Sequence, residues 1–169
     1  MSLTCTLVAT GSLMDEAGVP ALLGVLKAEG VVVKHDAHLY EYHSAEARAD
    51  KLIAAMSDSG NNVIWSVRGG EGSADLLPFV IPKLEMLKAH KPKCLVGFSD
   101  FTPILNVVAQ HLGWPVLHGP AALQLVQAKL DQGSHGLVWN VVQGKARQWA
   151  LSNLTPMNDA AKKVGEIKA

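Results

Sequence analysis

Short apolar runs alternate along the chain with segments whose apolar residues recur at helical spacing. Thr4–Thr10 is rich in β-forming residues and stops at Gly11-Ser12. The next segment, Pro20–Glu29, has helical apolar spacing, a proline at its start and Gly30 directly after its end, which are typical boundaries of a helix. A strand followed by a helix predicts the first unit of an α/β fold.

The same alternation continues through the first three quarters of the chain. Four further strands are predicted at Val31–Val33, Asn62–Val67, Lys93–Phe98 and Pro115–Leu117. Helices are predicted between and after them at Ser44–Gly60, Leu76–Ala89, Phe101–Leu112 and Pro120–Leu130. Strands that are apolar throughout and separated by helices indicate a parallel sheet covered on both faces. We therefore predict a three-layer α/β/α fold, Rossmann- or flavodoxin-like, with a mostly parallel sheet of about five strands.

The last part of the chain has a different pattern. Leu137–Gln143 and Arg147–Leu151 are predicted to form a short β-hairpin around Gly144-Lys145. Residues 152–169 are polar and are predicted to be a linker. The chain is thus expected to divide into an α/β domain at residues 1–136 and a hairpin with linker at residues 137–169.

The composition favours one well-packed domain and excludes several classes of protein. Of the 169 residues, 49% are hydrophobic and 18% are charged, a balance that argues against disorder. The 15 basic and 15 acidic residues cancel, so no face suited to nucleic acid is expected. No apolar run is long enough to span a membrane, and two cysteines form neither a disulfide framework nor a metal motif. We expect a cytoplasmic protein.

The carboxyl ends of the predicted strands carry the residues that could do chemistry. In a parallel sheet these ends lie on one rim, where ligands bind. Four of the predicted strands end in Gly11-Ser12, Arg68-Gly69-Gly70, Ser99-Asp100 and His118-Gly119. The rim that these segments form is the expected functional site.

Ser99 is the strongest candidate for a catalytic residue. A predicted buried strand leads through Gly97-Phe98 into Ser99 and Asp100, and then directly into a helix. A serine on such a turn presents its hydroxyl above the sheet as a nucleophile, and the amide of Asp100 is placed to stabilise an oxyanion. In the alternative interpretation, Ser99 or Asp100 only caps the helix. The G-x-S-x-G pattern also lacks its last glycine, because Phe101 stands there.

Arg68–Ser73 is a turn with three glycines in four positions. Such a turn lets the backbone approach a ligand closely, and Arg68 is suited to hold a substrate carboxylate. In the alternative interpretation this is an ordinary loop, and Arg68 pairs with a neighbouring acid. The turn matches neither a dinucleotide fingerprint nor a P-loop, so no nucleotide cofactor is expected.

A serine nucleophile needs a base, which is usually a histidine. Only His118 falls at the end of a predicted central strand, where it either faces the site or shapes the turn at Gly119-Pro120. One loop gathers His35, His38 and His43 with Asp36 and Glu41. This loop is either a metal site or, as we favour, a set of solvated side chains. We expect no metal and assign no base within the chain.

Five groups of residues follow one another in a fixed order. They are Tyr40 with Ala45–Arg48 and Asp50; Arg68-Gly69-Gly70-x-Gly72 with Leu76-Leu77-Pro78; Lys91-Pro92-Lys93; Val96-Gly97-Phe98-Ser99-Asp100-x-Thr102; and His118-Gly119-Pro120. In this order they resemble the N-terminal half of the LD-carboxypeptidase family of serine peptidases. That family includes muramoyltetrapeptide carboxypeptidases and microcin C immunity peptidases.

The resemblance implies that Ser99 is the nucleophile and that the amides of Asp100 and of the Gly69-Gly70 turn form the oxyanion hole. In this family a C-terminal domain supplies the glutamate and histidine of the triad, and no residue of this chain inherits those two roles. Glu71 and Phe98 stand where the family often carries tyrosine. The residues predicted to bind substrate are Arg68, Glu71, Phe98 and His118.

The implied reaction is serine-dependent hydrolysis of an LD-peptide bond without a cofactor, typically the release of D-alanine from a murein tetrapeptide. A microcin C-type immunity peptidase is an alternative within the family. A further alternative is that a separate polypeptide completes the active site. In an alternative from a different class, the chain is a non-catalytic domain that binds a peptide or amino-acid carboxylate through Arg68. We expect the isolated chain to be inactive or nearly so. The family also commonly forms homodimers.

Overall fold

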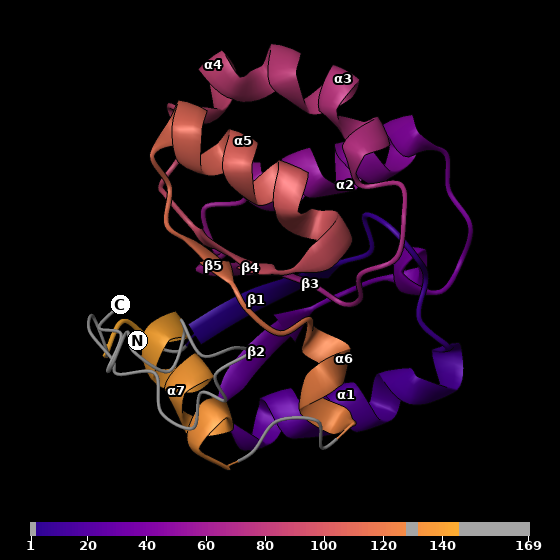
Figure 1. Cartoon of the computed structure of the whole chain (residues 1–169), viewed down its shortest axis with the longest axis vertical. Helices are drawn as coiled ribbons and strands as arrows, with labels where there is room; N and C mark the ends of the chain where they lie inside the picture. Colours follow the sequence, from indigo (N-terminus) through magenta and orange to yellow (C-terminus); the bar gives the residue numbers. More distant parts are fainter. Residues whose placement is uncertain (1–2, 128–131, 146–169) are drawn as a thin grey trace, which may run out of the picture.

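The computed structural model describes residues 3–127 and 132–145, which form a sheet between two layers of helices (Figure 1). The five strands are β1 (Leu3–Val8), β2 (Val31–Lys34), β3 (Val63–Ser66), β4 (Cys94–Gly97) and β5 (Val116–His118). All are parallel, in the order β2-β1-β3-β4-β5. The predicted α/β fold is confirmed, and the strand order is the flavodoxin-like one.

Helices cover both faces of the sheet (Figure 1). One face carries α1 (Val19–Ala28), α6 (Ala122–Val126) and α7 (Gln132–Val142). The other carries α2 (Ala45–Ser57), α3 (Leu77–Val80), α4 (Leu84–Leu87) and α5 (Thr102–Leu112). Pro78 and Pro82 divide the helical segment predicted at residues 76–89 into short α and 3-10 turns, because proline lacks the N–H that continues a helix. None of the described helices is long and apolar enough to cross a membrane.

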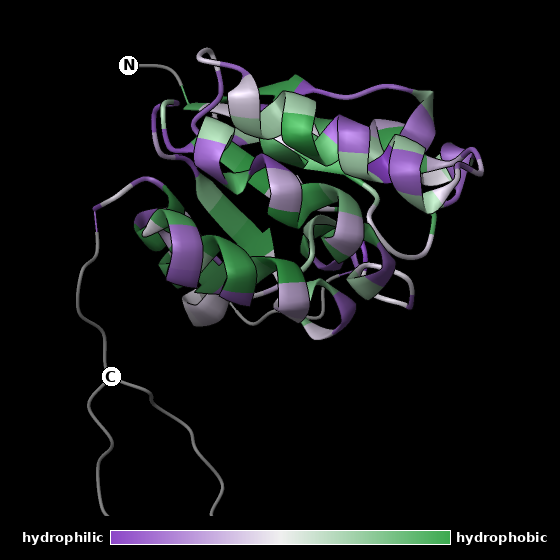
Figure 2. Cartoon of the chain, turned by 90° about the horizontal axis from the view of Figure 1, so that it is seen from above, coloured by the Kyte–Doolittle hydropathy of each residue, from purple (hydrophilic) through white to green (hydrophobic). Residues whose placement is uncertain are grey.

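Each face of the sheet has its own apolar core. Along β3, Val63 and Trp65 pack with α1, α6 and α7, whereas Ile64 packs with α2 to α5. All four residues of β3 are buried. Because both of its faces are covered, β3 does not alternate between buried and exposed residues. Seen from above, the helices carry hydrophobic and hydrophilic segments in alternation (Figure 2), as expected of helices with one buried side.

The strand predicted at Leu137–Gln143 is wrong, because these residues belong to helix α7 up to Val142. Val138, Trp139 and Val142 are buried, a spacing that places them on one side of a helix. The Trp139 ring packs edge-on against Trp65 of β3, with ring centroids 5.4 Å apart. The predicted domain boundary at residues 136/137 therefore falls inside a helix that contributes to the core. The second predicted strand, Arg147–Leu151, and the linker at residues 152–169 lie outside the described residues.

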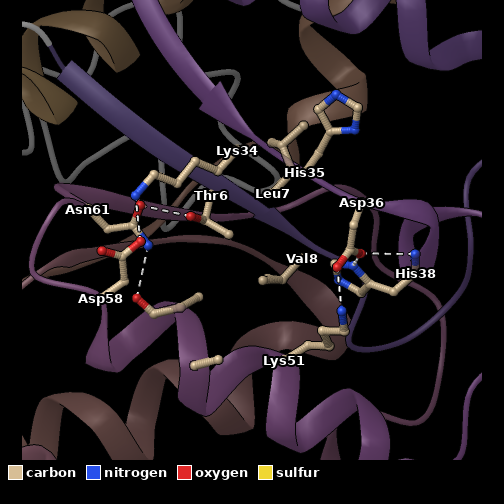
Figure 3. Close-up of a pocket in the computed structure, with 12 residues that line it drawn as sticks. Thr6, Leu7, Val8, Lys34, His35, Asp36, His38, Lys51, Asp58 and Asn61 are labelled. Carbon is tan, nitrogen blue, oxygen red and sulfur yellow. Dashed lines mark hydrogen bonds and ion pairs between the residues drawn. The ribbon is translucent and has the colours of Figure 1, made fainter.

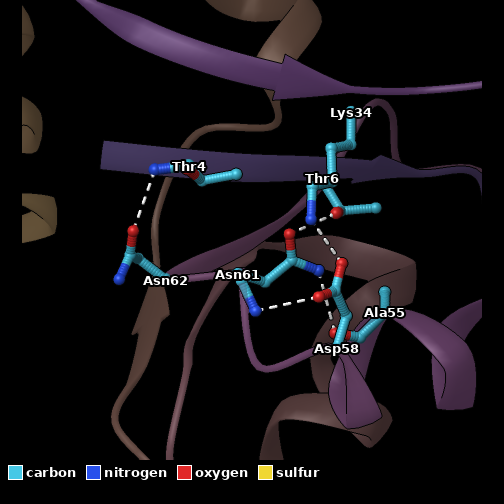
Figure 4. A network of polar contacts seen from close by, with 8 residues as sticks. Thr4, Thr6, Lys34, Ala55, Asp58, Asn61 and Asn62 are labelled. Atoms are coloured by element: carbon cyan, nitrogen blue, oxygen red, sulfur yellow. Dashed lines mark hydrogen bonds and ion pairs between the residues drawn. The ribbon is translucent and has the colours of Figure 1, made fainter. Parts of the chain in front are cut away.

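Amide side chains anchor the connection between α2 and β3 at the amino end of the sheet (Figure 4). Asn61 is 1% exposed; its Oδ1 accepts from the Thr6 hydroxyl at 2.8 Å, and its Nδ2 donates to the Ala55 carbonyl at 3.0 Å. The neighbouring Asn62 accepts from the backbone N–H of Thr4 at 2.9 Å. These bonds tie α2 and β3 to β1 and fix the central strands relative to one another.

Candidate active site

The candidate site lies where the strand order changes direction. Strand β1 has β2 on one side and β3 on the other, so the connections leaving β1 and β3 diverge. Such a switch point at the carboxyl ends of the strands is where open α/β sheets bind ligands. The segments there are Thr10–Ser12 after β1, Arg68–Gly70 after β3 and Ser99–Asp100 after β4.

Ser99 stands in a strained turn between β4 and α5. Its φ is +57°, and it is the one non-glycine residue with positive φ in the described part of the chain. The left-handed conformation costs an ordinary residue about 1–2 kcal/mol, and strain of this kind gathers at functional sites. Ser99 is exposed, so its hydroxyl is open to a substrate.

The alternative interpretation of this turn, in which Ser99 or Asp100 only caps the helix, is not observed. The short 3-10 helix Ser99–Phe101 and helix α5 both begin without a side-chain capping hydrogen bond. The carboxylate of Asp100 instead accepts from the Ser73 backbone N–H at 3.0 Å and from the Ser73 hydroxyl at 2.6 Å. Neither Ser99 nor Asp100 therefore serves as a helix cap, and Asp100 ties this turn to the glycine-rich turn after β3.

The glycine-rich turn lies directly against Ser99. A Cβ atom added to Gly69 would lie 3.4 Å from the Cβ of Ser99. Gly70 has a φ of +121°, and a Cβ there would lie 1.9 Å from the Ser12 hydroxyl oxygen. A side chain at residue 70 would therefore be strained and would displace its neighbour. The Gly69 carbonyl accepts from the Ser12 N–H at 3.3 Å, so in a planar trans peptide the Gly70 N–H points away from Ser12.

A pocket of about 370 Å³ opens beside Ser99. Strands β3 and β4 supply one part of its wall through the turns that follow them, and helix α6 with its N-terminal turn supplies the other. The lining residues are Arg68, Gly69, Gly70, Phe98, Ser99, Ala121, Leu123, Gln124 and Gln127. The structure thus brings together Ser99, the predicted oxyanion glycines and two of the predicted substrate-binding residues.

Arg68 is the one charged residue among those that line this pocket. The other two titratable residues predicted to bind substrate, Glu71 and His118, do not line it. Arg68 is exposed, and its Nη1 donates to the Leu13 carbonyl at 3.3 Å. Within the described residues it makes no ion pair with an acid, contrary to the alternative for this loop. Glu71 and His118 are both exposed. His118 ends β5 and pairs with Gly97 in the sheet.

A second pocket, of about 260 Å³, lies between β2 and α2 (Figure 3). Its charged side chains already pair with one another: Lys34 with Asp58 at 2.5 Å, and Lys51 with Asp36. These pairs bridge the edge strand to α2 over an apolar floor that includes Val8. The groups that would recognise a ligand satisfy each other here, so the Ser99 pocket is the stronger candidate for chemistry.

His38 is buried beside the end of β1, so the prediction of a solvated loop histidine is wrong for this residue. It is 5% exposed. Its Nε2 accepts from the Ala9 N–H at 3.2 Å, and its Nδ1 pairs with Asp36. No group of three or more His, Cys, Asp or Glu side chains in the described residues is arranged to hold a metal. His38 instead fixes the backbone just before the Thr10–Ser12 turn of the rim.

The stability of the chain is expected to fall below neutral pH because of His38. Burial lowers the pKa of His38 from its ordinary value of about 6.5, and pairing with Asp36 opposes this only in part; Lys51 and His43 lower it further. The folded state binds the proton less readily than the unfolded chain, so the free energy of unfolding decreases as pH drops below about 6.5. Urea denaturation across this range measures the loss.

His38→Gln is expected to cost about 1–3 kcal/mol at neutral pH, since it disturbs a buried hydrogen-bond network. It should also flatten the pH profile relative to the wild type. His111→Gln, at an exposed histidine in the last turn of α5, is the matched control and should change the profile little. A His38→Gln profile parallel to that of the wild type would contradict this account.

The fold and the rim define an α/β domain with a strained serine turn between a central strand and a helix. Residues 6–119 match the LD-carboxypeptidase N-terminal domain. This chain belongs to that family.

Relatives of the chain bear carboxypeptidase names. A Rickettsia prowazekii protein named as a carboxypeptidase is 36% identical over 125 residues, which cover 74% of this chain and 38% of that protein. The murein tetrapeptide carboxypeptidase of Pseudomonas aeruginosa is 32% identical over 124 residues, covering 70% of this chain and 39% of the relative. The matched part of the chain therefore spans well under half the length of each of these relatives.

Solved structures share the fold at lower identity. An MccF-like protein of Streptococcus pneumoniae superposes with a TM-score of 0.72 at 23% identity, over 100% of this chain and 55% of that one. The muramoyltetrapeptide carboxypeptidase of Oxalobacter formigenes gives a TM-score of 0.74 at 20% identity, over 88% of this chain and 50% of that one.

Proposed function

We propose that this chain is the nucleophile-bearing N-terminal half of a serine carboxypeptidase that hydrolyses an LD-peptide bond. The observation that carries the proposal is Ser99: a strained, exposed serine between β4 and α5, beside a pocket and against a glycine-rich turn. The substrate is a small peptide with a free terminal carboxylate, such as the murein tetrapeptide that loses D-alanine. The enzyme acts in peptidoglycan recycling in the cytoplasm.

In this reaction the Ser99 hydroxyl oxygen attacks the carbonyl carbon of the scissile amide, and its proton passes to a base. The carbonyl oxygen becomes an oxyanion. Collapse of the tetrahedral intermediate breaks the C–N bond, the amine leaves with a proton as D-alanine, and an acyl ester remains on Ser99. Water then hydrolyses this ester and restores the serine.

Backbone amides stabilise the oxyanion. The amide of Asp100 lies one residue beyond the nucleophile, at the start of the helical segment, where the partial positive charge of the backbone favours an anion. The Gly70 amide is the second donor: its N–H points away from Ser12, and the turn that contains it packs against Ser99. Removal of one such donor typically costs about 100- to 1,000-fold in kcat.

Recognition of the terminal carboxylate belongs to Arg68. Its guanidinium is exposed at the pocket and has donors beyond the one given to Leu13. A planar guanidinium binds a carboxylate with two parallel hydrogen bonds. Phe98 supplies an apolar wall of the pocket. Glu71 and His118, which are exposed and outside the lining, contact the part of the substrate farther from Ser99.

A C-terminal domain supplies the base. The triad glutamate and histidine come from that domain, either as a continuation of this chain or as a separate polypeptide. This chain continued by the C-terminal domain of the family is here called the two-domain protein. The wild-type isolated chain lacks the base, so it binds substrate weakly and does not turn it over.

The test is D-alanine release from a murein tetrapeptide. The isolated 169-residue chain is expected to release none above background, and the two-domain protein is expected to turn the substrate over. Release by the isolated chain that is abolished by Ser99→Ala would overturn the division of the site between two domains. Carboxylate binding that survives Ser99→Ala, with no turnover in either protein, would instead support a non-catalytic binding domain.

A further inference from the structure

A series of connected hydrogen bonds joins four segments of the protein beside Ser99. The Asp100 carboxylate accepts from the backbone N–H of Ser73 at 3.0 Å and from its hydroxyl at 2.6 Å. The Ser73 hydroxyl also bonds to the Thr10 hydroxyl at 2.8 Å, and Arg48 of α2 donates to the Thr10 carbonyl. The nucleophile turn, the glycine-rich turn, the exit of β1 and α2 are thus joined at one point.

The direction of these hydrogen bonds follows from the chemistry of the Asp100 carboxylate, which stands at one end of the series. An ionised carboxylate only accepts hydrogen bonds, so the single hydroxyl hydrogen of Ser73 goes to Asp100. The Thr10 hydroxyl must then be the donor to Ser73. Thr10 and Ser73 are each 1% exposed, so the bond between their hydroxyls is shielded from water. The network is satisfied in this one orientation.

Gly11, in the turn that follows β1, leaves room for the same carboxylate. A Cβ added to Gly11 would lie 2.1 Å from Asp100 Oδ2 and 3.2 Å from its Cγ. Oδ2 is also the oxygen that Ser73 binds most closely. Only a residue without a side chain leaves room for Asp100 here.

The glycine-rich turn is held at both ends. At its start, the Gly69 carbonyl accepts from the Ser12 N–H, and at its end Ser73 donates twice to Asp100. Without these bonds a segment with three glycines has many conformations open to it. An oxyanion hole works only when its donors are fixed before the charge develops.

We propose that the side chains of Asp100 and Ser73, here called the Asp100–Ser73 clamp, position the Gly69-Gly70 turn against Ser99. Asp100 is thereby a positioning residue through its carboxylate, in addition to the role of its amide. The proposal rests on the proposed function in one respect, since the benefit of the clamp is a correctly placed oxyanion donor. The placement itself can be measured without any activity.

Hydrogen–deuterium exchange on the 169-residue chain measures the placement. In Asp100→Ala, the Ser73 amide is expected to exchange at least about tenfold faster, the factor that corresponds to losing one hydrogen bond of about 1.4 kcal/mol. Amides 69–72 should exchange faster with it. Asp100→Asn keeps an acceptor oxygen and should restore most of the protection. Asp75→Ala, at an exposed aspartate in the short 3-10 helix Ala74–Leu76 that follows the turn, is the matched control and should leave it unchanged.

Kinetics of the two-domain protein measure the consequence. Asp100→Ala is expected to lower kcat by about 10- to 100-fold while KM changes by less than about threefold, since Arg68 is untouched and only donor placement is lost. Gly11→Ala should have the same effect, because its methyl group displaces the carboxylate. Combined with Asp100→Ala, Gly11→Ala should cause little further loss, since the clash with the carboxylate is then gone and only a 3.3 Å approach to the Glu71 carbonyl oxygen remains.

These readouts separate the clamp from the proposed function. Unchanged exchange at residues 69–73 in Asp100→Ala overturns the clamp, whatever the activity. Equal losses in Asp100→Ala and Asp75→Ala, or additive losses in the Gly11/Asp100 pair, also overturn it. If exchange changes as expected but the wild-type two-domain protein hydrolyses no LD-peptide, the proposed function fails and the clamp stands as the device that orders this turn.

Discussion

Replacement of Ser99 by alanine in the two-domain protein is expected to lower kcat by about 100,000-fold or more, with little change in substrate binding. The reason is that no acyl ester can form, and losses of this size follow removal of a serine nucleophile. The pocket walls and Arg68 remain, so the dissociation constant of an uncleaved tetrapeptide should stay within about threefold of the wild-type value. D-alanine release and isothermal calorimetry measure the two quantities.

Two further variants separate chemistry from folding. Alanine keeps the strain of the left-handed backbone at residue 99, whereas Ser99→Gly relieves it and should make the chain about 1 kcal/mol more stable than Ser99→Ala. Ser59→Ala, at an exposed serine in the turn after α2, is the matched control for activity and should have none of these effects. Substantial turnover by Ser99→Ala would remove Ser99 from the nucleophile role.

Gly70→Ala is expected to lower kcat by about 100- to 1,000-fold and to destabilise the isolated chain by about 1–3 kcal/mol. An alanine Cβ would lie 1.9 Å from the Ser12 hydroxyl oxygen, 2.5 Å from the Ser12 Cβ and 3.0 Å from its backbone nitrogen. The backbone near Ser12 must therefore move, and a φ of +121° adds strain of its own. Either adjustment shifts the amide proposed to bind the oxyanion.

Gly24→Ala is the control for this substitution. Gly24 is exposed within α1, and a Cβ there meets no atom within 4 Å. Because alanine favours a helix, this variant should be more stable by about 1 kcal/mol and fully active. Urea denaturation and steady-state kinetics compare the two variants. Wild-type kcat in Gly70→Ala would show that the Gly69-Gly70 turn does not contribute an oxyanion donor.

The sheet could be predicted from sequence because local pattern and burial agree along it. The strand Asn62–Val67 is apolar nearly throughout, and in the structure β3 is buried on both faces. Helix α2 begins where expected, since Ser44 caps it by accepting from the Ala47 N–H at 3.2 Å. The turn at Ser99 follows from a buried strand that meets a helix with no loop between them. Such features are local in the chain, so pattern reasoning finds them.

Helix α7 could not be distinguished from a strand by the same reasoning. Leu137–Val142 is a short apolar run, and short runs of this kind fit a buried helix or a strand equally well. The deciding contact is that of Trp139 with Trp65, which is made between residues far apart in the chain. His38 is buried for a similar reason: its partner Ala9 follows another strand, 29 residues away.

The residues that hold the site together were also beyond sequence reasoning. Thr10 and Ser73 are 63 residues apart in the chain, and Ser73 and Asp100 are 27 apart. Each is a short polar residue in a turn, a type that is common in any loop. The one available signal was their position directly after the predicted strands, which marked the rim but not the contacts within it.

The most direct test of Ser99 as the nucleophile is covalent labelling with a fluorophosphonate, located by peptide mass spectrometry. We expect one adduct, on Ser99, in the two-domain protein. It should be absent from Ser99→Ala and, because the C-terminal domain is proposed to supply the base, from the isolated chain as well. If the two-domain protein hydrolyses a murein tetrapeptide while the probe labels a residue other than Ser99, the account is contradicted.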